Sequence, residues 1–115
     1  MPRKPINGAP KQGMPPNPNP PPVEDNATVQ LIVEGRVQGV GYRFFAHQEA
    51  QRFGLRGWVR NLPNGFVEAQ AQGSRAALEQ WITILRHGPP LSRVDHIRIN
   101  WVESSALFDA FEIRV

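Results

Sequence analysis

Residues 55–72 read LRGWVRNLPNGFVEAQAQ, two strand-like runs around the turn sequence Leu-Pro-Asn-Gly. Pro63 fixes one φ angle, and Asn64 and Gly65 readily take the positive φ angles that a tight hairpin needs. The segment therefore predicts two antiparallel strands, at 55–61 and 66–72. This hairpin forms the middle of the domain, and each of its strands connects outward to a helix.

The segment before the hairpin has the pattern of a strand followed by a helix. Alternating apolar side chains in residues 28–34 indicate a strand with one apolar face, ending at Gly35. Apolar residues then recur at helical spacing, and Gly54 is placed to stop the helix in a left-handed conformation. The strand residues are Val29, Leu31 and Val33, and the helix residues are Phe45, Ala46, Ala50 and Phe53.

The segment after the hairpin has a helix followed by two strands. Ser74 is a suitable N-cap for the helix, and the run Gly-Pro-Pro at 88–90 terminates it. The apolar stripe of this helix is Leu78, Trp81, Ile82 and Leu85. Ile97, Ile99 and Trp101 indicate a fourth strand, and Phe111, Ile113 and Val115 indicate a short fifth.

This order predicts an α+β, ferredoxin-like fold, the split βαβ arrangement with a short C-terminal strand added. In that arrangement an antiparallel sheet has both helices on one face and leaves its other face to solvent. Right-handed crossovers place the first strand inside the sheet, so the loop after it opens at the sheet's end beside the first helix. We expect a functional site there.

Residues 1–26 differ in composition from the rest of the chain. Nine of the 12 prolines lie in the first 22 residues, and large apolar side chains are nearly absent from this part. Such a segment cannot bury enough surface to offset the entropy of ordering. We predict a disordered, Pro-rich N-terminal tail at 1–26 and one folded domain at 27–115. A polyproline II segment that binds a partner is the alternative for the tail.

Composition also limits the classes of function. The chain has no cysteine, which excludes disulfides and thiolate metal sites. No apolar run reaches the roughly 18 residues of a membrane span. The net charge of +3 is mild and the arginines are scattered, which suits a small anionic ligand at least as well as a polyanion. We expect a soluble, cytoplasmic, monomeric protein with no membrane or nucleic-acid partner.

Residues 35–43, Gly-Arg-Val-Gln-Gly-Val-Gly-Tyr-Arg, lead from the first strand into the first helix. The glycines let successive backbone N–H groups point inward, and the helix N-terminus adds unpaired donors and partial positive charge. Arg43 can bind two oxygens at once. The segment predicts an anion cradle for phosphate, although alone it is also consistent with a tight turn that carries a surface arginine.

A second segment, residues 57–67, reads Gly-Trp-Val-Arg-Asn-Leu-Pro-Asn-Gly-Phe-Val. Together the two segments resemble the signatures of the acylphosphatases. The family's Gly-x-Val-Gln-Gly-Val-x-Tyr/Phe-Arg matches residues 35–43, and its Gly-aromatic-Val-x-Asn followed by Gly-x-Val matches residues 57–67. The spacing of 18 residues from Arg43 to Asn61 also looks like the family's. The resemblance covers residues 27–115 and none of the tail.

The resemblance implies hydrolysis of the mixed anhydride between a carboxylic acid and phosphate, with an acyl phosphate as small-molecule substrate and without a metal or other cofactor. Arg43 falls on the family's phosphate-binding arginine, and Asn61 falls on the asparagine that positions the attacking water. The backbone that wraps the phosphate corresponds to Val37, Gln38, Gly39, Val40, Gly41 and Tyr42.

Hydrolysis of an acyl phosphate is possible with only an arginine, an asparagine and backbone N–H donors. The leaving carboxylate comes from an acid with a pKa of about 4 to 5, so it departs as an anion and needs no general acid. Oriented N–H donors and a guanidinium can stabilise the charge on the transferring phosphoryl group. Asn61 can hold a water but is not a strong base. Our hypothesis is that an oxygen of the substrate's phosphate accepts the proton.

Other classes of function remain as alternatives. A noncatalytic phosphate-binding module would keep the same cradle, so Asn61 alone argues for turnover. An RNA-binding domain would need exposed aromatic side chains on the central strands. Residues 28–34 have none, and the third strand offers only Phe66. We predict surface or capping roles for His47, His87 and His96, which lack metal-ligand spacing, and core positions for Trp58, Trp81 and Trp101.

Overall fold

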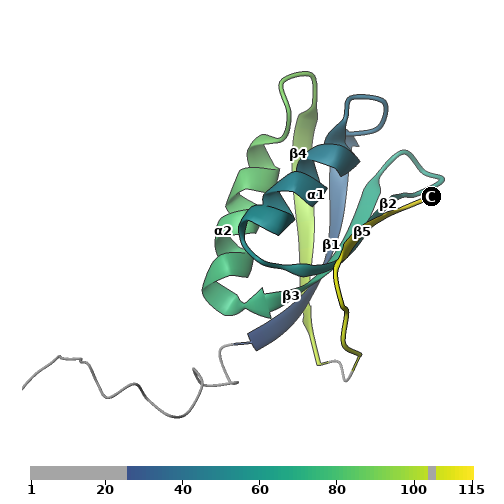
Figure 1. The fold of residues 1–115 in the computed structure, drawn as a ribbon. Helices are drawn as coiled ribbons and strands as arrows, with labels where there is room; N and C mark the ends of the chain where they lie inside the picture. The colour runs from purple at the N-terminus through teal and green to yellow at the C-terminus, as the bar shows by residue number, and fades with distance from the viewer. Residues whose placement is uncertain (1–25, 104–105) are drawn as a thin grey trace, which may run out of the picture.

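The computed structural model describes residues 26–103 and 106–115. Its helices and strands follow the predicted order (Figure 1). They are β1 (Asn26–Arg36), α1 (Tyr42–Arg52), β2 (Arg56–Asn61), β3 (Val67–Ser74), α2 (Arg75–His87), β4 (Arg93–Val102) and β5 (Phe111–Arg114). The predicted disordered tail at 1–26 lies outside the described residues except for Asn26, which already belongs to β1.

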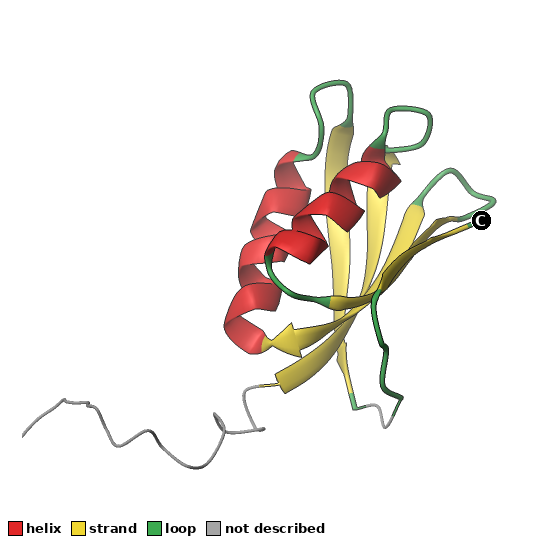
Figure 2. Ribbon diagram, in the orientation of Figure 1, coloured by secondary structure: helices red, strands yellow, loops and turns green. Residues whose placement is uncertain are grey.

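The sheet places β1 between two partners. The strand order is β4-β1-β3-β2-β5, and β1 pairs antiparallel with both β3 and β4. In this register Val29 lies opposite Ala71 on β3 and opposite Trp101 on β4. Both helices cover the same face of the sheet (Figure 2). The predicted α+β, ferredoxin-like fold is confirmed, including the inner position of the first strand.

The last strand differs from the expected pattern in its direction. β5 pairs parallel with β2, Gly57 lying opposite Phe111, so the sheet is mixed rather than wholly antiparallel. After β4 the chain crosses the end of the sheet to the opposite edge, and β5 begins at the end where β4 stops. β5 must therefore run opposite to β4. β2 also runs opposite to β4, which makes the pair of β2 and β5 parallel.

The core lies between the sheet and the two helices. Trp81 of α2 is fully buried and stacks edge-on against Phe111, with ring centroids 5.7 Å apart. Its Nε1 donates a hydrogen bond to the carbonyl of Ala46 on α1 at 3.1 Å. The whole predicted stripe of α2 is buried: Leu78, Trp81, Ile82 and Leu85. Burial of each large apolar side chain stabilises the fold by about 1.5–3 kcal/mol.

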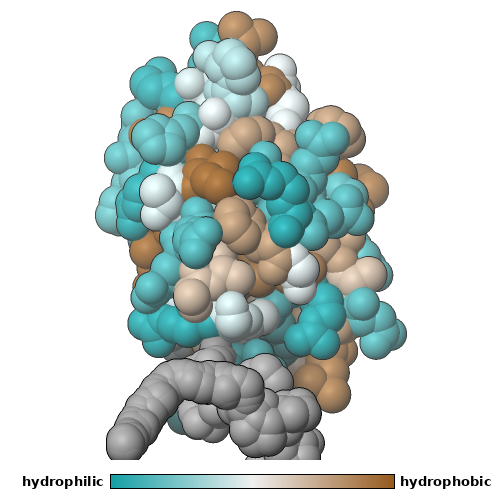
Figure 3. All heavy atoms as spheres, turned by 60° about the vertical axis from the view of Figure 1, so that its left-hand side comes forward, coloured by the Kyte–Doolittle hydropathy of each residue, from teal (hydrophilic) through white to brown (hydrophobic). Residues whose placement is uncertain are grey.

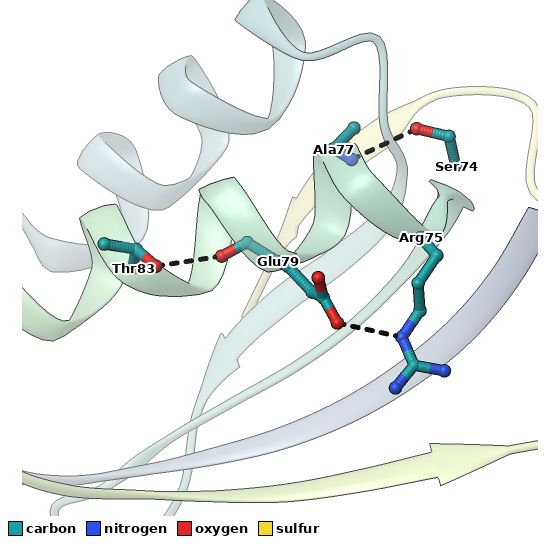
Figure 4. Close-up of polar contacts among 5 residues, drawn as sticks. All are labelled: Ser74, Arg75, Ala77, Glu79 and Thr83. Atoms are coloured by element: carbon teal, nitrogen blue, oxygen red, sulfur yellow. Dashed lines mark hydrogen bonds and ion pairs between the residues drawn. The ribbon is translucent and has the colours of Figure 1, made fainter.

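The start of α2 is stabilised by its own sequence (Figure 4). Ser74 accepts a hydrogen bond at Oγ from the backbone N–H of Ala77 at 3.1 Å, which confirms the predicted N-cap. Such a cap contributes about 1 kcal/mol. Arg75 pairs with Glu79 at 3.2 Å one turn later, and the hydroxyl of Thr83 donates to the carbonyl of Glu79. These contacts fix the helix directly after β3.

The first glycine of each signature segment has a packing role. Gly35 has a φ of 136°, and a side chain there would meet the backbone of β4 at Arg93. Gly57 has a φ of 150°, and a side chain there would meet the carbonyl oxygen of Gln70 on β3. Both glycines therefore allow neighbouring strands to approach closely just before the loops that carry the candidate site.

The tryptophans follow the prediction of core positions to different degrees. Trp58 and Trp81 are buried, whereas Trp101 is half-buried beneath the guanidinium of Arg75, 3.7 Å from its ring centre. An arginine in this position gains a cation–π interaction and shields the ring from water. Trp101 thus packs against the edge of the core and is covered on its outer side by a surface side chain.

The exterior is a mixture of polar and apolar residues. Figure 3 brings the left-hand side of Figure 1 forward, and there the apolar residues form small areas separated by hydrophilic ones. Scattered apolar surface of this kind is ordinary for a folded domain. Neither of the helices in the described residues has the length and apolar character needed to cross a membrane.

Candidate active site

The loop of residues 37–41 joins β1 to α1, at the same end of the molecule as the turn between β2 and β3 (Figure 1). Gly39 and Gly41 have φ angles of 74° and 80°, which glycine adopts without strain. Gly41 is also the N-cap of α1 and gives the helix no side-chain hydrogen bond, unlike Ser74 at the start of α2. The first N–H groups of α1 are therefore available to an anion.

Two buried side chains hold the ends of this loop. Val37 and Tyr42 are each 1% exposed and belong to the core. The hydroxyl of Tyr42 donates to the carbonyl of Leu85 at 2.8 Å. That carbonyl lies in the last turn of α2, where its ordinary helical partner would be the nitrogen of Pro89, which has no hydrogen. Burial raises the pKa of the Tyr42 phenol, so it remains a donor.

The side chain of Gln38 joins the loop to the hairpin. Its Nε2 donates to the carbonyl oxygens of Leu62 and Phe66, both at 2.8 Å. These carbonyls flank the turn that follows Asn61, so Gln38 sets the distance between the two signature segments. The sequence predicts only a backbone role for Gln38, so these side-chain contacts were missed. The only sign of this contact in the sequence was a long amide side chain between small residues. Its hydrogen-bond partners could not be known before the fold.

Arg43 and Asn61 lie at one pocket of about 230 Å³. Arg43 comes from the first turn of α1 and Asn61 from the last position of β2, and both side chains are half-buried. The pocket is lined by Val37, Gly39, Gly41, Tyr42, Arg43, Phe44, Asn61 and Ile113. The remaining predicted loop residues point elsewhere: Gln38 reaches the hairpin, and Val40 packs against the core.

The guanidinium of Arg43 is oriented by the last strand. Its Nη1 donates to the main-chain carbonyl of Arg114 at 2.9 Å. A guanidinium has five N–H donors in a planar fork, so this bond leaves others for two phosphate oxygens. With the N-terminus of α1 beside it, the pocket combines a fixed positive charge with backbone donors. This arrangement can bind a tetrahedral oxyanion and hold a water at the amide of Asn61.

A cavity of about 160 Å³ lies beside the start of β1, lined in part by Thr28, Arg56 and Gln72. The amide of Gln72 is already bonded to the connection before β5, at Ala106 and Phe108. This cavity carries no signature residue.

The histidines give no metal site among the described residues, which hold no cluster of three or more His, Cys, Asp or Glu. His47 is half-buried, whereas a surface or capping role is predicted for it from the sequence. Its ring packs 6.0 Å from that of Phe111, and its Nδ1 is buried without a hydrogen bond. Helix α1 turns this face toward β5, which places the ring in the packing between them. His87 and His96 are exposed, in line with the predicted surface roles.

A family model described as acylphosphatase matches residues 29–113. The chain belongs to the acylphosphatase family. The matched span contains both signature segments and every residue that lines the pocket of Arg43 and Asn61.

Similar acylphosphatases come from several organisms. The protein of Anaeromyxobacter dehalogenans is 46% identical over 90 residues, which are 78% of this chain and 97% of that one. The protein of Thermus thermophilus is 47% identical over 76 residues, 66% of this chain and 86% of that one. The crystal structure of acylphosphatase from Bacillus subtilis matches with a TM-score of 0.75 at 38% identity, covering 76% of this chain and 98% of that one.

Proposed function

We propose that this acylphosphatase hydrolyses the carboxyl–phosphate bond of acyl phosphates to a carboxylate and inorganic phosphate, with Arg43 binding the phosphate and Asn61 orienting the attacking water. One observation carries the assignment of roles. A single pocket joins the guanidinium of Arg43, the uncapped N-terminus of α1 and the amide of Asn61.

The phosphate is bound by charge and by backbone donors. The guanidinium of Arg43 binds two oxygens in its planar fork, and the backbone N–H groups of residues 37–42 bind the rest. Gly39 and Gly41 have left-handed φ angles, which allow successive N–H groups of such a loop to point inward. The same donors stabilise the charge that spreads over the equatorial oxygens in the transition state.

The water attacks phosphorus in line with the departing carboxylate. The amide of Asn61 has one acceptor oxygen and two N–H donors, which are enough to orient a water. A neutral amide is not a strong base, so it does not remove the proton of that water. The proton passes to an oxygen of the substrate's phosphate. The carboxylate leaves as an anion, so no residue has to protonate it. We propose that these groups suffice without a metal ion.

We also propose that the protein is a monomer, in which one chain supplies both Arg43 and Asn61 to the same pocket. Sedimentation or size-exclusion measurements across protein concentrations test this, and activity confined to a dimer would contradict it. The cytoplasmic location expected from composition stays a prediction.

The function is tested by phosphate release from benzoyl phosphate and acetyl phosphate with the purified full chain. We expect release well above the uncatalysed rate, and the same rate after treatment with a chelator. Absence of release would contradict the hydrolase assignment. Loss of activity with the chelator, restored by a divalent metal ion, would contradict the metal-independent mechanism.

A further inference from the structure

Two large apolar side chains lie exposed at the pocket of Arg43 and Asn61. Phe44 is 58% exposed and Ile113 is 42% exposed, and both line this pocket. The other large apolar side chains of the pocket, Val37 and Tyr42, are each 1% exposed and face the core. Phe44 and Ile113 therefore supply the apolar surface that the pocket presents to solvent.

These two side chains come from different parts of the chain, and each is next in sequence to a residue of the Arg43–Arg114 hydrogen bond. Phe44 follows Arg43 in the first turn of α1, and Ile113 precedes Arg114, whose carbonyl accepts the hydrogen bond from Arg43. Isolated exposed apolar residues are ordinary on protein surfaces. Two of them that line the same pocket as Arg43 can together form a contact surface.

The substrate needs a place for its acyl group. The phosphate is held by Arg43 and by the N-terminus of α1, so the acyl group must extend away from these donors. Val37 and Tyr42 are closed off by the core, and the glycines carry no side chain. Phe44 and Ile113 are what remains for an acyl group to touch near the mouth of the pocket.

We propose that Phe44 and Ile113 form an acyl-contact surface that favours acyl phosphates with aromatic or extended apolar acyl groups over acetyl phosphate. This inference rests on the proposed function. An aromatic acyl group would cover both side chains and gain an edge or offset contact with the Phe44 ring. Phe44 and Ile113 act in this way on substrate preference, while Arg43 acts on the phosphate and Asn61 on the attacking water.

The size of the effect follows from the contacts involved. An aromatic pair contributes enough to change binding by about three- to tenfold. Because the acyl group is in contact both before and during the reaction, the contact binds ground state and transition state alike. We expect the preference to lie mainly in KM rather than in kcat.

The experiment compares kcat/KM for benzoyl phosphate and acetyl phosphate in the full chain and in Phe44→Ala, Ile113→Ala and the double variant. Leu107→Ala is the matched control, since Leu107 is 82% exposed and lines the cavity beside the start of β1. We expect Phe44→Ala to lower the benzoyl-to-acetyl ratio by about three- to tenfold, mostly through KM, and the double variant to lower it further. Inhibition by inorganic phosphate should stay the same, and Phe44→Trp should keep the ratio.

The outcomes separate this inference from the proposed function. An unchanged ratio in the double variant, with both substrates still hydrolysed, would overturn the acyl-contact surface alone. An equal loss on both substrates together with weaker phosphate inhibition would also overturn it, because Phe44 would then be positioning Arg43. Failure of the unaltered chain to hydrolyse either substrate would overturn the proposed function and the inference with it.

Discussion

Arg43 on the first turn of α1 donates from Nη1 to the main-chain carbonyl of Arg114 on β5, at 2.9 Å and across 71 residues of sequence. The bond ties a charged side chain to a backbone group, so the sequence of position 114 has little influence on it. It also makes β5 part of the candidate site, because this edge strand determines the direction in which the guanidinium points. The parallel pairing of β5 with β2 brings that carbonyl to the end of the sheet where Asn61 lies.

Arg43→Lys should lower kcat/KM for benzoyl phosphate by about 10²–10³-fold. Lysine keeps the positive charge but loses the planar fork, and it cannot bond the Arg114 carbonyl and two phosphate oxygens in the same geometry. Inhibition by inorganic phosphate should weaken in parallel. Arg52→Lys, in the exposed last turn of the same helix, is the control and should behave like the unaltered chain. Normal turnover in Arg43→Lys would remove Arg43 from the mechanism.

Asn61→Ala should lower kcat by about 10²-fold while inorganic phosphate still inhibits as before. The variant removes the amide that orients water but leaves the guanidinium and the α1 N-terminus in place. Steady-state kinetics with phosphate inhibition measure both effects. Asn100→Ala, exposed on β4, is the matched control. If Asn61→Ala lost phosphate affinity and kept kcat, the water-orienting role would be wrong.

Gln38→Ala should lower kcat/KM clearly while it lowers the free energy of unfolding only slightly. The two carbonyls that Gln38 binds keep other donors, from the N–H of Leu62 and of Gly65, so the free energy of unfolding should fall by only about 1 kcal/mol. The loop, however, loses its tie to the segment that carries Asn61. Urea unfolding and steady-state kinetics test this, with Gln51→Ala as an exposed control on α1. Unchanged kinetics would show that the loop is held by the core alone.

Tyr42→Phe should lower the free energy of unfolding by about 1–2 kcal/mol at neutral pH, because the Leu85 carbonyl loses its donor. Burial raises the pKa of Tyr42 above its ordinary value of 10.0, so above about pH 10 the unfolded chain gives up this proton while the folded chain keeps it. Stability of the unaltered chain should fall there as the pH rises, and the difference from Tyr42→Phe should shrink.

The tyrosine prediction has a direct spectroscopic readout, since Tyr42 is the single tyrosine of the chain. Its absorbance change on ionisation should occur together with alkaline unfolding rather than before it. Ionisation near pH 10 in the folded state, with far-UV circular dichroism unchanged, would show that the phenol is accessible and the burial argument wrong.

Helices and strands could be predicted from the sequence where the residues that determine them lie close together in the chain. The N-cap at Ser74 and the stop at Gly54 depend on residues within one turn, and both are as expected. The partner and direction of β5 were not predictable, because alternation at 111–115 indicates a strand without naming its neighbour. Ile99 and Ile113 alternate like core residues yet remain exposed. They lie on β4 and β5, the edge strands, and alternation alone does not tell which strands lie at the edges.

Within the site, Arg43 and Asn61 could be chosen from the two signature segments, and the fold does bring them to one pocket. Their roles stay predictions. The side-chain bonds of Gln38 and the carbonyl partner of Arg43 could not be read from the sequence. Each depends on where a segment distant in sequence crosses the loop, and this is decided by the sheet order rather than by local pattern.

The inner position of β1 also has a consequence for the rate of folding. β1 is paired with strands that come much later in the chain, Asn26 with Ser74 and Thr28 with Val102. Such long-range pairing costs loop-closure entropy before any contact repays it, which slows folding relative to helical proteins of the same size. During refolding, α2 can form early from its own cap and stripe. Because the two signature segments meet only when β1 has paired with β3, we expect recovery of catalysis to be among the last events that a refolding experiment detects.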